Sequence, residues 1–213
     1  LFAAFPMVYA TVFSGFYLAF MLLLLALIFR GVSIEFHHQL NNSRWKNFWD
    51  WGFGLSSILA SILFGVAIGN ILRGIPLDAQ FNYTGSFLDL LNPYALVMGL
   101  LSLAMFTMHG AAFLYGRGTS ELAGKSRRWA RKAWAVYLLL FVVGTVWSYL
   151  ATPRLFINYF EFPLLFVAPA ITLAALLYFP KTFKANSPWA PFLTSALSIV
   201  GIIDYRRWAF SVF

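Results

Sequence analysis

The chain has 213 residues, of which 61% are hydrophobic and only 10% are Asp, Glu, Lys or Arg. A soluble domain carries roughly a quarter charged residues, so this composition excludes an ordinary soluble protein and predicts that lipid surrounds most of the chain. The absence of cysteine excludes disulfides, thiolate metal sites and cysteine nucleophiles. The formal net charge of +8 would suit nucleic acid, but the positions of the basic residues argue against that function.

Apolar segments dominate the chain, and none alternates in the way that a membrane β-strand would. Lipid offers the backbone no hydrogen-bond partner, so we expect each segment to be a helix. The "NPY" that opens the third segment predicts Asn92 as an N-cap and Pro93 as the first helical residue. Pro169 lies inside the fifth. The predicted spans are 7–29, 53–72, 93–115, 133–151, 163–179 and 189–203.

These spans predict an all-α, polytopic transmembrane helix bundle over residues 1–203. Residues 204–213 are an atypical C-terminal end, because Asp204, Arg206 and Arg207 would be costly inside a span. Helices buried within a soluble protein are the disfavoured alternative, since so little polar surface is left to cover them.

The basic residues orient the bundle. Eleven of the fifteen Lys and Arg residues lie in the connections 30–50, 116–132 and 180–188, and the other four are Arg73, Arg154, Arg206 and Arg207. Basic residues gather in cytoplasmic loops, so the three connections face the cytoplasm. The segment "KSRRWARKAW" is thus a topology signal and a candidate contact for anionic headgroups, not a nucleic-acid site. The tryptophans beside the spans are interpreted as interfacial anchors.

Three histidines could hold a haem iron. His37 and His38 follow the first span in a polar connection, where a solvated pair is the favoured interpretation. His109 lies inside the third span, where an ionisable residue suggests function. A hydrogen bond to a neighbouring helix is the favoured role there, and a ligand or proton carrier is the alternative. A bis-histidine haem would lack a second partner within the membrane.

The first span ends at Arg30, and Glu35 follows five positions later. On a continuous helix the two residues are about 140° apart around the axis, so they do not face each other as a four-residue pair does. Arg30 could simply snorkel to the headgroups. None of the seven carboxylates lies at the middle of a span, so the core of a proton relay is missing from these residues.

Several segments resemble subunit II of the cytochrome bd-type quinol oxidases, from Leu1 to about Gly201. The matching words are "LFAAFPMVYATVFSGFYLA", "FRGVSIEFHHQ", "RWKNFWDWGF", "GVAIGNILRGIP" and "YTGSFLDLLNPYALVMGLLS". They occur in the family's order and spacing. The resemblance predicts a fragment that lacks the family's N-terminal helices, with their Trp–Asp motif, and its C-terminal end.

The resemblance implies a haem-free subunit of a terminal oxidase that oxidises quinol and reduces dioxygen to water. The partner, subunit I, would carry haem b, haem d and the catalytic centres. A small single-helix subunit and membrane lipids are further expected partners. Expected localisation is the bacterial or archaeal cytoplasmic (inner) membrane.

The resemblance also selects residues. Arg30, Glu35 and Asp50 match family positions and are candidates for the proton path or for support of the partner subunit. His109 lies where relatives often carry other residues, which weakens it as a cofactor ligand. No catalytic residue, bound cofactor or metal is expected in this chain. The rival functions are a multispanning transporter, which would show internal repeats and broken helices, and a non-catalytic membrane assembly protein.

Overall fold

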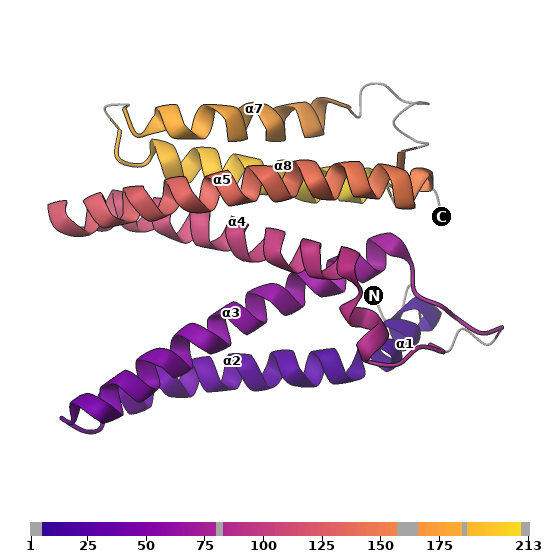
Figure 1. Ribbon diagram of the computed structural model, residues 1–213, viewed down its shortest axis with the longest axis horizontal. Helices are drawn as coiled ribbons and strands as arrows, with labels where there is room; N and C mark the ends of the chain where they lie inside the picture. The colour runs from indigo at the N-terminus through magenta and orange to yellow at the C-terminus, as the bar shows by residue number, and fades with distance from the viewer. Residues whose placement is uncertain (1–5, 80–82, 157–165, 185–186, 210–213) are drawn as a thin grey trace. The chain divides into compact units, whose positions relative to one another are not determined.

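The computed structural model describes residues 6–79, 83–156, 166–184 and 187–209, which are largely helical (Figure 1). Among these residues, β-structure is limited to one isolated antiparallel bridge between Leu77 and Tyr83. The predicted all-α class is therefore confirmed. The elements are α1 (Pro6–Gly15), α2 (Tyr17–His37), α3 (Ser43–Arg73), η1 (Leu88–Leu91), α4 (Pro93–Arg117), α5 (Ser120–Ala151), η2 (Pro153–Phe156), α7 (Val167–Thr182) and α8 (Ala190–Ala209).

Four helices in the described ranges, α2, α3, α4 and α5, are long and apolar enough to cross a membrane. The two longest, α3 with 31 residues and α5 with 32, rise about 1.5 Å per residue and so exceed a hydrocarbon core of roughly 30 Å. Their surplus turns must lie outside that core. The chain is a multi-pass membrane protein.

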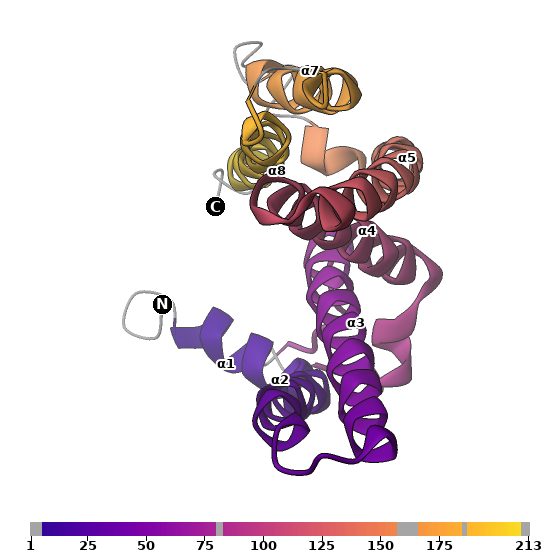
Figure 2. The ribbon, with the colours of Figure 1, turned by 90° about the vertical axis from the view of Figure 1, so that its left-hand side faces the viewer.

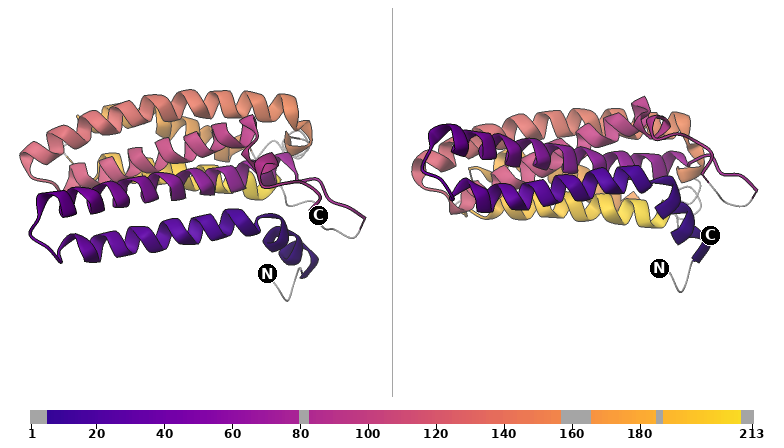
Figure 3. Two further views of the ribbon diagram at one scale, coloured as in Figure 1. Left: turned by 60° about the horizontal axis from the view of Figure 1, so that its bottom comes forward. Right: turned by 90° about the horizontal axis from the view of Figure 1, so that it is seen from below.

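The chain divides into two compact units, with the boundary inside α4. In the first unit, α2 and α3 lie side by side as a helical hairpin (Figure 3). The Asn42 side chain caps α3 by accepting a hydrogen bond from the backbone N–H of Arg44 at 2.9 Å. The Trp45 indole donates to the Phe36 carbonyl at 2.7 Å, so a side chain from α3 fastens the end of α2.

The apolar segment predicted at 7–29 is divided between two helices. The break lies at Phe16, between α1 and α2, and the Phe16 ring is buried. Next to it, a Cβ placed on Gly15 would lie 3.1 Å from the Cβ of Tyr83. The loop that carries Tyr83 therefore packs against the break, which the apolar pattern alone does not reveal.

Small residues let α3 approach the first turns of α4 within the same unit. A Cβ on Gly69 would lie 2.9 Å from the Cα of Ala95, and one on Gly65 would lie 2.7 Å from the Cα of Gly99. Gly65 and Gly69 are one turn apart, in the small-xxx-small spacing of closely packed membrane helices. Backbone contact between helices is therefore the basis of this packing.

A buried amide pair joins the end of α3 to the segment that leads into α4. The side-chain amide of Asn70, a residue that is 3% exposed, donates to the backbone carbonyl of Leu90 at 2.7 Å. The side-chain oxygen of Asn70 accepts from the side-chain amide of Asn92 at 2.8 Å. The Asn92 oxygen in turn accepts the Ala95 amide at 3.0 Å. The predicted N-cap at Asn92, with Pro93 as the first helical residue, is thus confirmed.

In the second unit, α7 and α8 pack along each other (Figure 2). Pro180 lies inside α7, although the sequence suggested that a cytoplasmic connection begins there. A proline has no N–H, so the carbonyl four residues earlier, on Leu176, loses its helical donor. The Trp134 indole of α5 donates to that carbonyl at 2.7 Å. A neighbouring helix thus supplies the missing hydrogen bond, as a membrane interior requires.

The ends of the last two predicted spans differ from the helices. Residues 163–165, where the fifth span was predicted to begin, lie outside the described residues, and α7 begins at Val167. The helix α8 runs on to Ala209, through most of the segment predicted to be atypical. Residues 210–213 also lie outside the described residues.

Candidate functional site

Arg30 lies inside α2, not at its end, because the helix continues for two further turns to His37. Its side chain is exposed, and its guanidinium carbon lies 5.3 Å from the centre of the Phe53 ring on α3. A cation over an aromatic face is stabilising by about 0.5–1 kcal/mol at exposed sites. This contact holds the guanidinium against the neighbouring helix of the hairpin.

Glu35 is exposed on the last turns of the same helix. Because α2 continues through both residues, the expected angular separation from Arg30 applies. Within the described ranges neither residue makes an ion pair. Glu35 therefore presents a free carboxylate near the turn of the hairpin, and Arg30 a guanidinium bound to a ring.

Asp50 meets His37 across the hairpin, with 3.3 Å between the carboxylate Oδ1 and the imidazole Nε2. The His37 ring also contacts that of His38 edge-on, with centres 4.7 Å apart. Both histidines keep contact with solvent, since His38 is exposed and the His37 side chain is 26% exposed, and His37 is in addition the partner of a candidate carboxylate. A partner on the opposite helix leaves no signal in the spacing along one helix, so the sequence could not indicate it.

His109, on α4, bonds to Ser195 on α8, with 2.8 Å between Nδ1 and Oγ. The Ser195 hydroxyl also lies 2.7 Å from the Phe192 carbonyl and can donate to it. With its proton placed there, the Ser195 oxygen accepts from the Nδ1–H of His109; in the other imidazole tautomer, Ser195 donates to Nδ1. The Phe192 ring stacks on the imidazole at 4.7 Å.

A polar cleft of about 550 Å³ lies between the end of α3, the loop that follows it and η1. Asn70, Arg73, Tyr83 and Asp89 are among the residues that line it. The Ser86 amide donates to Asp89 at 2.6 Å and lowers the pKa of that carboxyl. Burial, and then the charge of Asp89, raises the pKa of Tyr83.

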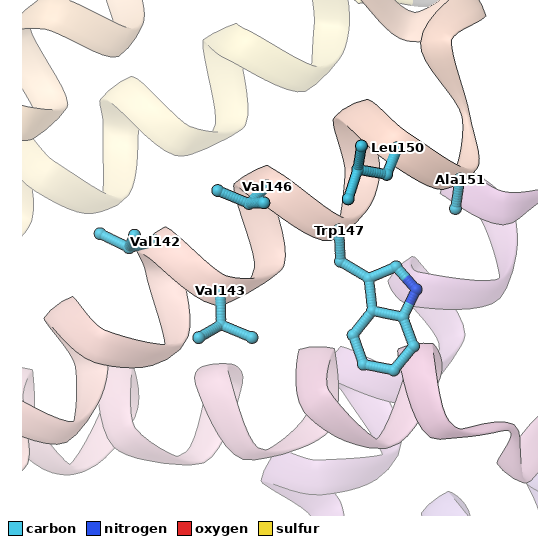
Figure 4. A pocket seen from close by; sticks show the side chains of 6 residues that line it. All are labelled: Val142, Val143, Val146, Trp147, Leu150 and Ala151. Carbon is cyan, nitrogen blue, oxygen red and sulfur yellow. The ribbon is translucent and has the colours of Figure 1, made fainter.

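A second hollow, of about 630 Å³, lies on one face of α5 (Figure 4). Its lining is almost wholly apolar, so it has no group that could carry acid–base chemistry. Six residues line it: Val142, Val143, Val146, Trp147, Leu150 and Ala151. In the described ranges no cluster of three His, Asp or Glu side chains is suited to a metal ion.

The chain matches the family model of cytochrome bd terminal oxidase subunit II over residues 1–210. The chain belongs to this family. This confirms the resemblance seen in the sequence, and it accounts for a run of apolar helices with few carboxylates. Family membership by itself assigns no role to a single residue.

Three relatives show how much of the family's length is present. A probable cytochrome oxidase subunit 2 from Haemophilus influenzae is 36% identical over 95% of this chain and 61% of its own length. The cytochrome bd-I ubiquinol oxidase subunit 2 of Escherichia coli K12 is 42% identical over 69% of this chain and 40% of its own length. A cytochrome bd ubiquinol oxidase subunit 2 from Bacillus subtilis is 35% identical over 64% of this chain and 40% of its own length. The chain thus spans about two fifths to three fifths of the relatives that it matches.

Within this subunit II chain, the candidate residues form two separate groups. The α2–α3 hairpin carries Arg30, Glu35 and Asp50, to which the structure adds His37. His109 belongs to the packing between α4 and α8. Arg30, Glu35 and Asp50 are exposed and His37 is half-buried, whereas His109 lies among aromatic and hydroxyl groups.

Proposed function

We propose that this chain is the haem-free subunit of a terminal oxidase that oxidises quinol and reduces dioxygen to water. The family match over residues 1–210 carries this proposal. The relative from Escherichia coli is named as a subunit of a ubiquinol oxidase. The catalytic centres, haem b and haem d, would belong to the partner subunit I. The complex would lie in the bacterial cytoplasmic (inner) membrane, with lipids and a small single-helix subunit as further partners.

The role of the chain would be support of subunit I and access of protons from the cytoplasmic side. Glu35 and the Asp50–His37 pair are supported as proton-side groups by their exposure and by their shared place at one end of the hairpin. Arg30, held against Phe53, supplies a fixed positive charge on the same hairpin. Protons reach a buried reaction centre through ionisable groups of this kind.

The decisive experiment expresses the full-length gene together with its subunit I gene in a host that lacks quinol oxidases. Membrane haem spectra and quinol-dependent oxygen uptake are then measured with and without this chain. We expect both signals to require the chain. Unchanged spectra and unchanged uptake after its deletion would refute the oxidase function.

A variant tests the role of the hairpin separately. Arg30→Gln is expected to lower oxygen uptake or haem retention, because it removes the fixed charge and its contact with Phe53. Lys125→Gln is the matched control, since it removes one exposed positive charge from α5. If Arg30→Gln behaves like the wild type in both measurements, only interfacial snorkelling remains for Arg30.

A further inference from the structure

Two arginines of α5 lie against one aromatic ring in the second unit. The guanidinium carbons of Arg127 and Arg131 are 5.8 Å and 5.7 Å from the centre of the Phe183 ring. Phe183 caps the end of α7 and is 5% exposed. Since Arg127 and Arg131 are one helical turn apart, their side chains leave the same face of α5, and both guanidinium groups border the shared ring.

Neither charge is compensated within the part of the chain that the structure describes. Among the described residues, the ion pair on α5 joins Lys125 to Glu121 at 2.7 Å and involves neither arginine. The Nε atom of Arg127 is covered and has no hydrogen-bond acceptor. Like charges held close together repel each other, and buried donors normally have acceptors. An anion with several oxygen atoms would relieve both problems.

The position along α5 indicates where such an anion comes from. The exposed stripe of this helix is basic at Lys125, Arg128 and Lys132. After Lys132 it becomes apolar: Val136 is 49% exposed and Leu139 is 64% exposed. The helix therefore passes from the headgroup layer into the hydrocarbon within about one turn of Arg131.

We propose that Arg127 and Arg131 bind the phosphate of an anionic phospholipid, whose acyl chains lie along the apolar stripe that begins at Val136. A guanidinium presents paired donors that match phosphate oxygens. The choice of an anionic lipid follows because, among the described residues, no carboxylate forms an ion pair with either arginine, so none of them would bind the ammonium group of a zwitterionic headgroup.

The test uses the full-length protein with its partner subunit, purified in detergent and delipidated. Native mass spectrometry compares retention of dioleoyl phosphatidylglycerol with that of dioleoyl phosphatidylcholine. The wild type is expected to retain phosphatidylglycerol preferentially. The double variant R127Q/R131Q is expected to lower that preference about tenfold or more, because both arginines lose their charge-assisted hydrogen bonds to the phosphate.

The matched control is R128Q/K132Q, which removes the same charge from the exposed stripe of the same helix. It is expected to keep most of the preference. An equal loss in both double variants would mean diffuse surface attraction and would overturn the proposal. A further variant, R131K, keeps the charge and the alkyl stem and serves if R127Q/R131Q does not fold. It should lower the preference for phosphatidylglycerol, because lysine lacks the paired donors of arginine. A wild-type preference in R131K would count against the site.

Thermal unfolding distinguishes the lipid from free phosphate. Phosphatidylglycerol is expected to raise the Tm of the delipidated wild type, whereas inorganic phosphate at the same concentration should not. Equal stabilisation by inorganic phosphate would overturn the lipid assignment. Preferential binding of phosphatidylglycerol only after removal of the partner subunit would show that protein covers the arginine pair, which would also overturn it.

Discussion

The indole of Trp134 donates a 2.7 Å hydrogen bond to the carbonyl of Leu176, which is the carbonyl that Pro180 deprives of its helical donor. The helix α7 therefore continues through a proline because a side chain from α5 replaces one backbone N–H. This hydrogen bond makes the stability of α7 depend on a different helix.

Trp134→Phe should destabilise the protein by about 1–2 kcal/mol, because it leaves the Leu176 carbonyl without a donor in a membrane environment. In a Pro180→Ala background the backbone N–H returns, so the same change should cost less. Reversible unfolding of the four proteins in mixed micelles measures this coupling. Trp129→Phe, at a tryptophan that is 62% exposed, is the control. Equal costs of Trp134→Phe in both backgrounds would contradict the compensation.

Gly65→Ala should weaken the packing of α3 on α4, because the new Cβ would lie 2.7 Å from the Cα of Gly99. We expect a loss of about 1–3 kcal/mol, as for other overpacked sites. Gly54→Ala, on the same helix with nothing within 4 Å of the new Cβ, should be neutral or stabilising by up to about 1 kcal/mol. Unfolding measurements on both variants check the difference, and similar losses at the two glycines would argue against close contact at Gly65.

Asp89 should make the segment around η1 in the first unit sensitive to acid. Its folded pKa lies below the ordinary value of 3.8, chiefly because it accepts the Ser86 amide. Its contribution to stability is therefore present above pH 3.8 and is lost as the pH falls through the folded pKa. Asp89→Asn should lower the Tm at neutral pH, and the difference from wild type should shrink below about pH 4. A difference independent of pH would assign the effect to shape and not to charge.

Ser195→Ala should remove the hydrogen-bond partner of the His109 Nδ1 while keeping the size of the site nearly constant. The expected cost is about 0.6–1.7 kcal/mol, the range of interhelical hydrogen bonds in membranes. If the role of His109 is packing and hydrogen bonding, His109→Gln should leave the haem spectra of the assembled oxidase unchanged. A shifted or missing haem band in that variant would instead favour a ligand role.

Asp50→Asn should lower oxygen uptake at alkaline pH more than at acidic pH, if Asp50 and His37 help deliver protons. Proton supply limits the reaction most where protons are scarce, and the variant loses the carboxylate of the 3.3 Å pair. Glu121→Gln is the matched control, since it removes an exposed carboxylate from α5. A uniform loss across the pH range, with reduced haem content, would indicate structural support in place of proton transfer.

Much of the fold could be predicted because each helix carries its own signal. The N-cap at Asn92 and the proline after it are local, and local chemistry decided where α4 begins. The break at Phe16 was not predictable in this way, since it coincides with packing of Tyr83 from a distant loop. The candidate site divides similarly: Asp50 was recognised from its sequence context, whereas His37 became its partner only through the hairpin.

The sequence alone established a helical membrane protein and its family, because neither composition nor motifs depend on which helices touch. The side of the membrane that the basic loops face stays a prediction from the charge distribution. Only the tertiary structure decided that Trp134 serves the carbonyl exposed by Pro180 and that His109 bonds to Ser195. A helix pattern shows which residues share a face. The partner across that face depends on packing between helices far apart in the chain, where a single donor or a missing Cβ selects the neighbour.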